Sequence, residues 1–256
     1  MHGEMALSNG MLLGFLLTLV RVSGVFLFVP LPGVNSVLSP ARVMLSMGMT
    51  IALFPEWPNV ANEPSIGLFI LWILVEASLG IGIGLAVAFI SEALLVGAQT
   101  MGLQAGYGFA TTIDPNSQAD STVLVTFAQL AAGLLFFATG LDREVLRIFA
   151  RSLELYPAGS FVLTRGAAMQ VLKVGSAMFS TGLRLALPMI AVLTMIDISL
   201  ALLGRVNAQL QLLTIAFPVK MIVALMLLGW LALLFPVLFR AGSGPAFVAA
   251  RGLLVH

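Results

Sequence analysis

Long apolar stretches with few charged residues are the feature that most limits how this chain can fold. Of its 256 residues, 60% are hydrophobic and only 9% are charged. A soluble domain carries about 25% charged residues, because its surface must face water. Backbone polar groups in lipid must be satisfied internally, which helices achieve within a single segment. We therefore predict an all-α integral membrane protein.

The apolar stretches are uneven in length. Crossing a hydrocarbon core about 30 Å thick takes about 20 helical residues. Six stretches are predicted to be helical: Met11–Pro30, Val43–Phe54, Ser65–Val96, Val123–Thr139, Met169–Leu203 and Leu210–Phe239. Prolines at positions 188, 218 and 236 are expected to interrupt the last two, and the less apolar Gly140–Arg165 is expected to be a loop. We predict one polytopic membrane domain over residues 1–256, built of irregular helical hairpins.

Several ionisable residues lie inside these apolar stretches. They are Arg21, Glu76, Glu92, Lys173, Arg184, Asp197 and Lys220. A charged side chain at the centre of a bilayer costs about 2.5–3.5 kcal/mol on insertion scales. We therefore expect these side chains to face protein, water or a partner subunit rather than lipid.

The third stretch carries a ridge in which small residues separate two carboxylates. Its members recur every four residues: Glu76, Gly80, Gly84, Ala88 and Glu92. Small residues allow another helix to approach closely, so the ridge is predicted to pack against a helix or a partner subunit. The alternative is a proton or cation path. The two carboxylates are about 24 Å apart along a helix, which is too far for direct relay.

A basic stripe is expected in the fifth stretch. Lys173, Ala177, Thr181 and Arg184 share one helical face, because eleven residues make close to three turns. The stripe could line an aqueous conduit or pair with acidic groups. Pairing is the interpretation that we favour, so Lys173 and Arg184 are predicted to be packing or subunit contacts.

The sequence offers little for catalysis or for a cofactor. Cysteine is absent, and histidine occurs only at positions 2 and 256. There is no His-Glu-x-x-His motif for zinc, no internal histidine to serve a nucleophile and no phosphate-binding glycine loop. We predict a protein that is not an enzyme and that needs no metal or cofactor.

The segment "GLQAGYGFATTIDPNSQADS", residues 102–121, is an unusual connection. Its glycines disfavour helix, and Asp114-Pro115 predicts a turn. Tyr107, Phe109 and Ile113 are too apolar for a solvated loop. Non-helical backbone at membrane depth is tolerated only when it is buried in protein or lines a cavity. The segment is predicted to be a re-entrant gate that closes a conduit, with a turn lying on the bilayer surface as the alternative.

Several motifs together resemble one family. "GLQAGYGFATTIDPNS", "LLFFATG", "SLELYPAGS" and "GLRLALPMIAVLTMIDISLALLGRVNAQLQLLTIAFPVKM" occur in this order, after "LVRVSGVFLFVPLPG" near the start. Together they resemble the FliR family of type III secretion export-gate proteins. The likeness extends over essentially the whole chain.

The resemblance implies a subunit of the flagellar protein export gate in the bacterial inner membrane, within the basal body. Its partners would be FliP-like and FliQ-like subunits in a hetero-oligomeric ring, an FlhB-like protein, and the unfolded flagellar proteins that are secreted. A loop at about residues 106–120 would plug the pore. The plug residues would be Gly106, Tyr107, Gly108, Phe109, Ala110, Ile113, Asp114 and Pro115. The alternatives are the equivalent subunit of a virulence injectisome and a small-solute secondary transporter, which broken helices and buried charges would suit.

Overall fold

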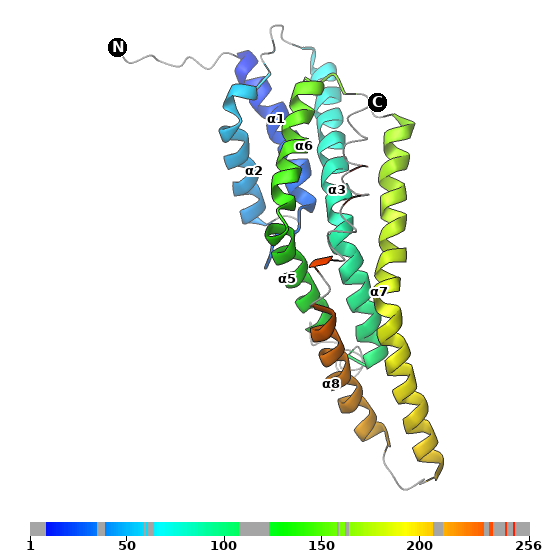
Figure 1. The fold of residues 1–256 in the computed structure, drawn as a ribbon. Coiled ribbons are helices and arrows are strands. Elements are labelled where there is room, and N and C mark those ends of the chain that lie inside the picture. The colour runs from blue at the N-terminus through cyan, green and yellow to red at the C-terminus, as the bar shows by residue number, and fades with distance from the viewer. Residues whose placement is uncertain are drawn as a thin grey trace. The chain divides into compact units, whose positions relative to one another are not determined.

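The computed structural model describes residues 9–34, 39–58, 60, 64–107, 123–157, 159–161, 164–206 and 212–232, with residues 236, 237, 244 and 248. In this part of the chain every regular element is a helix, which confirms the predicted all-α fold (Figure 1). The elements are α1 (Asn9–Phe28), α2 (Pro40–Ala52), the 3-10 turn η1 (Phe54–Glu56), α3 (Ile66–Ala105), α5 (Val123–Ala138), α6 (Leu141–Leu155), α7 (Arg165–Val206) and α8 (Leu212–Ala232).

In the described part of the chain, three helical stretches are long and apolar enough to cross a membrane. They are Asn9–Phe28, Ile66–Ala105 and Val171–Arg205, and Leu124–Ala138 with Leu141–Leu155 would add a fourth if counted as one span. This agrees with the predicted polytopic membrane protein.

The chain forms two compact units. The first unit holds Met1–Phe89, Gly140–Gly175 and Gly244–His256, and the second holds Ile90–Thr139 and Ser176–Ser243. The long helices α3 and α7 each contribute one end to each unit.

The stretch Gly140–Arg165 contains helix α6, so the predicted loop is wrong there. Its apolar residues have helical spacing and form one buried face: Leu141, Val145, Ile148 and Phe149, with Ser152. The charged residues on the opposite side of α6 lower the mean hydropathy of the segment. The apolar face was therefore not recognised from the sequence. Asp142 and Glu144 in the first turn also suit the positive end of the helix dipole.

Proline and glycine interrupt the long helices less than predicted. Helix α7 continues through Pro188 and α8 continues through Pro218. Helix α3 runs for 40 residues to Ala105, so Gly102 is helical rather than part of a loop. In an apolar setting, leaving the helix would expose several backbone groups, whereas one proline removes only one hydrogen bond.

In the first unit, α1 and α3 approach until their backbones touch. A Cβ on Gly80 would lie 2.2 Å from the Arg21 carbonyl oxygen, and one on Gly84 would lie 2.7 Å from the Val25 carbonyl oxygen. A Cβ on Gly24 would lie 2.8 Å from the Ile81 nitrogen. These glycines therefore set the distance between the two helices. Helix α2 is joined to the end of α1, because Arg42 donates to the carbonyls of Phe26 and Val29.

In the second unit, α3 and α7 also meet at glycines. A Cβ on Gly182 would lie 2.6 Å from the Ala93 carbonyl oxygen, and one on Gly97 would lie 3.1 Å from the Gly182 carbonyl oxygen. Figure 1 shows the end of α3 and helix α8 beside the C-terminal part of α7. This arrangement brings the end of α3, where the predicted plug begins, close to side chains of α7 and α8.

Candidate functional site

Helix α3 ends at Ala105, and Gly106 follows it in a specific capping arrangement. The Gly106 N–H donates to the Leu103 carbonyl at 3.1 Å, and the Tyr107 N–H donates to the Gly102 carbonyl at 3.0 Å. These two bonds, with Gly106 at a φ of +89°, make a Schellman motif. A Cβ at Gly106 would also lie 2.7 Å from the Phe217 ring. Backbone conformation and space both require glycine here.

The residue that follows ties the end of α3 to α8. The Tyr107 hydroxyl donates to the Met221 carbonyl at 3.0 Å. We call Gly106, Tyr107, Phe217 and Met221 the α3–α8 anchor. It fixes the position and direction in which the chain leaves α3. The segment that follows starts from a held point rather than from a frayed helix end.

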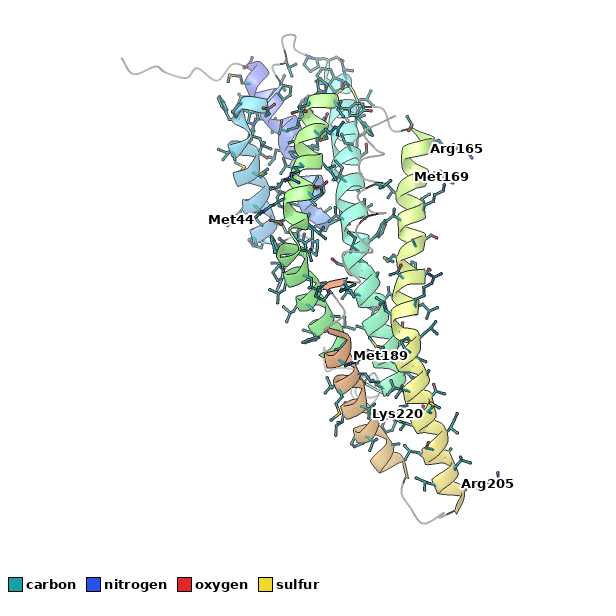
Figure 2. All side chains as sticks on the ribbon, viewed as in Figure 1. Met44, Arg165, Met169, Met189, Arg205 and Lys220 are labelled. Carbon is teal, nitrogen blue, oxygen red and sulfur yellow. The ribbon has the colours of Figure 1, made fainter. Side chains whose placement is uncertain are left out.

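A charged cluster joins the three helices of this region. Lys220 on α8 (labelled in Figure 2) lies with its Nζ 2.9 Å from Asp197 Oδ1 and donates to Oδ2 at 3.0 Å. Gln104 on α3 donates to Asp197 Oδ2 at 3.3 Å and to Thr194 Oγ1 at 3.4 Å. We call Gln104, Thr194, Asp197 and Lys220 the Asp197–Lys220 cluster. It links the last turn of α3 to α7 and α8.

A second charged cluster lies in the first unit and is almost completely buried. Arg21 on α1 pairs with Glu76 on α3, and each side chain is only 1% exposed. Arg21 Nη2 donates to Glu76 Oε1 at 2.9 Å and to the Tyr156 carbonyl at 2.8 Å, and Nη1 donates to the Ser152 carbonyl at 2.8 Å. The Gly159 N–H donates to Glu76 Oε1 at 2.9 Å. We call these five residues the Arg21–Glu76 cluster.

The Arg21–Glu76 cluster compensates its buried charges by hydrogen bonding. The Arg21 Nε also donates to Glu76, so the guanidinium meets the carboxylate through two parallel bonds. The remaining donors are directed at main-chain carbonyls of α6 and of the residue that ends it. The pair therefore joins α1, α3 and α6 at one point.

The other members of the predicted ridge differ in their surroundings. Gly80 and Gly84 lie against the backbone of α1, and Ala88 is buried. The Glu92 side chain is exposed on α3. The ridge thus runs from a buried end to an open end, and a subunit contact at Glu92 stays a prediction.

The predicted basic stripe on α7 is exposed. Neither Lys173 nor Arg184 has an ion-pair partner among the residues that the structure describes. A pairing of these side chains with another chain stays a prediction.

The structure describes only the start of the predicted plug. Gly106 and Tyr107 belong to the α3–α8 anchor, whereas Gly108, Phe109, Ala110, Ile113, Asp114 and Pro115 lie outside the described residues. Where residues are described, no three potential metal-ligating side chains come together.

The sequence pointed to the charged residues of both clusters but not to their partners. Arg21, Glu76, Asp197 and Lys220 were all recognisable as charges inside apolar stretches. Arg21 and Glu76 are 55 positions apart, and no local spacing relates them. The contribution of main-chain groups at Ser152, Tyr156 and Gly159 has no sequence signal at all.

Comparison with known proteins gives one consistent result. Residues 12–243 match the family model described as bacterial export proteins, family 1. The chain is 32% identical over 213 residues to the flagellar biosynthetic protein FliR of Escherichia coli K12, covering 82% of this chain and 81% of that protein. It is 30% identical over 198 residues to FliR of Pectobacterium carotovorum, covering 76% of each. It is 24% identical over 220 residues to FliR of Bacillus subtilis, covering 84% of each.

Proposed function

Since the chain belongs to the FliR family of bacterial export proteins, we propose that it forms part of the wall of a protein-conducting channel and carries the plug of that channel. The family match confirms the resemblance seen in the sequence motifs. It makes the chain a membrane component of the flagellar export apparatus. The proposal concerns what the chain does there.

The α3–α8 anchor is the observation that carries the proposal. A plug must close a pore reproducibly, so its first residues need a fixed starting point. The α3–α8 anchor supplies one through a Schellman motif and the Tyr107–Met221 hydrogen bond. The Asp197–Lys220 cluster holds the preceding turn of α3. The apolar residues Phe109 and Ile113 follow this held point within two turns' length of chain.

The channel itself is built jointly with other subunits. Its partners are FliP-like and FliQ-like membrane proteins in one ring of the inner membrane, associated with an FlhB-like protein in the basal body. Unfolded flagellar proteins pass through the ring. The exposed Glu92, Lys173 and Arg184 support this assembly, because none of them has an ion-pair partner in the described part of the chain, and such charges on apolar helices favour contact with polar groups of another chain.

Shortening the plug tests this function. Replacing residues 108–117 with a short Gly-Ser linker keeps the α3–α8 anchor and removes Phe109 and Ile113. We expect the variant to assemble with its FliP-like and FliQ-like partners and to make cells permeable to ions and small dyes. A matched control replaces residues 118–121, which contain no aromatic side chain, and it should not leak. Unchanged permeability in complexes that assemble fully would refute the plug.

A further inference from the structure

A small cavity lies beside the Arg21–Glu76 cluster, within the first unit. Its volume is about 150 Å³. Its polar lining consists of Thr18 and Arg21 of α1, Glu56 of η1 and Glu76 of α3. We call this cavity the Thr18 pocket. A water molecule takes about 30 Å³ in the liquid, so the Thr18 pocket has room for a larger group.

The hydroxyl of Thr18 is buried without a partner. Thr18 is 2% exposed, and its Oγ1 contacts no hydrogen-bonding group of the described residues. Other helical threonines, such as Thr50 and Thr139, donate to the carbonyl four positions earlier, but Thr18 makes no such bond to Gly14. Leaving a buried hydroxyl unsatisfied costs about 1–3 kcal/mol. We therefore expect a group from outside the chain to bind it.

The other open positions in the Thr18 pocket are hydrogen-bond acceptors. All three Arg21 nitrogens already donate within the Arg21–Glu76 cluster. Glu76 Oε1 accepts two hydrogen bonds, whereas Oε2 accepts only that from Arg21 Nε. Glu56 is exposed and has no ion-pair partner among the described residues. Two carboxylates thus meet one guanidinium, which leaves one negative charge uncompensated. Three groups can still accept a hydrogen bond: the Thr18 hydroxyl, Glu76 Oε2 and the Glu56 carboxylate.

The remaining walls of the Thr18 pocket are apolar and fixed in position. They are formed by Pro58, Leu153 and Pro157. The backbone of Pro58 packs directly on α1, because a Cβ on Gly14 would lie 2.2 Å from the Pro58 carbonyl oxygen. The preceding Trp57 donates its Nε1–H to the Thr50 carbonyl at 2.8 Å. The pocket is therefore formed before any ligand enters it.

We propose that the Thr18 pocket receives the side chain of a lysine from a neighbouring subunit of the complex. An ammonium group has three donors and one positive charge, which match the three open acceptors and the uncompensated charge. Lysine packs its methylene stem on apolar surface while its charged end reaches polar groups, which suits the apolar walls. The two lysines of this chain, Lys173 and Lys220, do not line the pocket. The inference rests on the proposed assembly with partner subunits and does not involve the plug.

Arginine and a free metal ion fit the Thr18 pocket less well. A guanidinium has five donors in a planar fork, which is more than the open acceptors can satisfy. A hard cation such as Ca²⁺ takes about six to eight oxygen ligands. The described lining offers only two carboxylates and one hydroxyl, and one of the carboxylates is already paired with Arg21.

Carbodiimide cross-linking tests the inference, because it joins a carboxylate directly to a lysine amine in contact with it. The complex with the FliP-like and FliQ-like partners would be treated, digested and analysed by mass spectrometry. We expect a peptide containing Glu56 joined by an amide to a lysine of a partner subunit. Glu56→Gln should lose this product. Glu154→Gln is the control, since it changes another exposed carboxylate, outside the pocket lining, and should retain the product.

Two negative results have different meanings. An assembled complex in which Glu56 couples to no lysine, or only to Lys173 or Lys220 of this sequence, would overturn the lysine site and leave the proposed assembly standing. Failure of the chain to assemble with its partners would refute the proposed assembly and the lysine site with it.

Thr18→Val gives a second measurement, which depends on the buried hydroxyl. Valine keeps the shape of the side chain and removes one acceptor of the ammonium group. We expect the yield of the Glu56 cross-link to fall about threefold or more and the Tm of the complex to decrease. Thr18→Ser keeps the hydroxyl and should give a yield close to that of the wild type. An unchanged yield with a raised Tm would contradict the lysine site, because removing a hydroxyl that has no partner stabilises a buried position.

Discussion

The two charged clusters differ in how deeply they bury their ion pairs and in which groups complete the hydrogen bonding. Each places an acid and a base between apolar helices, and each joins three helices. In the Arg21–Glu76 cluster both side chains are 1% exposed and main-chain groups complete the hydrogen bonding. In the Asp197–Lys220 cluster the side chain of Lys220 is 11% exposed and that of Asp197 is 41% exposed.

The difference has a physical consequence for movement. A planar guanidinium held by several acceptors tolerates little displacement, because each shift breaks a bond in a buried place. A lysine ammonium is a compact charge on a flexible stem, so it can follow a moving carboxylate. The first cluster is therefore suited to fix helices permanently. The second is suited to hold the start of the proposed plug while permitting small adjustments.

The largest expected effect comes from removing the charge of Glu76. Glu76→Gln keeps the size of the side chain but leaves Arg21 buried without a counter-charge. We expect a loss of about 3–5 kcal/mol in the free energy of unfolding. It should be measured by denaturant titration of the purified complex. Arg147→Gln is the control, since this exposed side chain pairs with Glu144 and should change stability by about 1 kcal/mol or less. Equal effects from both variants would remove the distinction between buried and exposed pairs.

The next effect concerns the spacing of α1 and α3. Gly80→Ala places a methyl group where the Arg21 carbonyl oxygen is 2.2 Å away, so the helices must separate. We expect a loss of about 3 kcal/mol, at the upper end for an overpacked contact. Gly48→Ala in α2 meets nothing within 4 Å and should stabilise its helix by up to about 1 kcal/mol. The sign of the change should differ between the two variants. A stable Gly80→Ala complex would show that the Arg21–Glu76 cluster tolerates movement of α1.

The Asp197–Lys220 cluster should respond more weakly and unequally to its two truncations. Asp197→Asn leaves a lysine that is buried, and we expect a loss of about 2 kcal/mol. Lys220→Met leaves a carboxylate that is 41% exposed, so its loss should be smaller. The double variant should recover part of the loss, which a double-mutant cycle would measure. Losses as large as that of Glu76→Gln would mean that this cluster is also rigid.

The sequence predicted the kind of fold better than the boundaries of its elements. Hydropathy was enough for an all-α membrane protein, since few other structures can bury so many apolar residues. It failed at α6, where the apolar residues occupy one face only and the average over the segment is low. The predicted interruption at Pro188 was also wrong. A proline is tolerated inside a helix when breaking the helix would cost more free energy than losing one backbone hydrogen bond.

The residues of the candidate site were also predictable only in part. Gly106 and Tyr107 were singled out as part of a non-helical segment, Gly106 because glycine disfavours helix and Tyr107 because it is too apolar for a solvated loop. Their partners, Phe217 and Met221, are more than a hundred positions away. Met221 contributes a main-chain carbonyl, to which any residue type would be equivalent. Contacts of this kind follow from the packing of α3 and α8, so no local pattern can predict them.

The smallest expected effect comes from the Tyr107 hydroxyl. Removing this hydroxyl tests whether Tyr107 positions the plug or closes the pore itself. Tyr107→Phe removes one hydrogen bond to Met221 and retains the ring. It should cost about 1 kcal/mol and leave assembly intact. If the α3–α8 anchor positions the plug, ion leakage through the closed complex should rise slightly above wild type. The leakage should remain far below that of the variant lacking residues 108–117.

Met221→Leu is the control, because it keeps the main-chain carbonyl that accepts the bond, and its leakage should equal that of the wild type. Leakage in Tyr107→Phe as large as in the loop deletion would assign the closing role to Tyr107 itself, whereas none at all would show that this bond does not set the position of the plug.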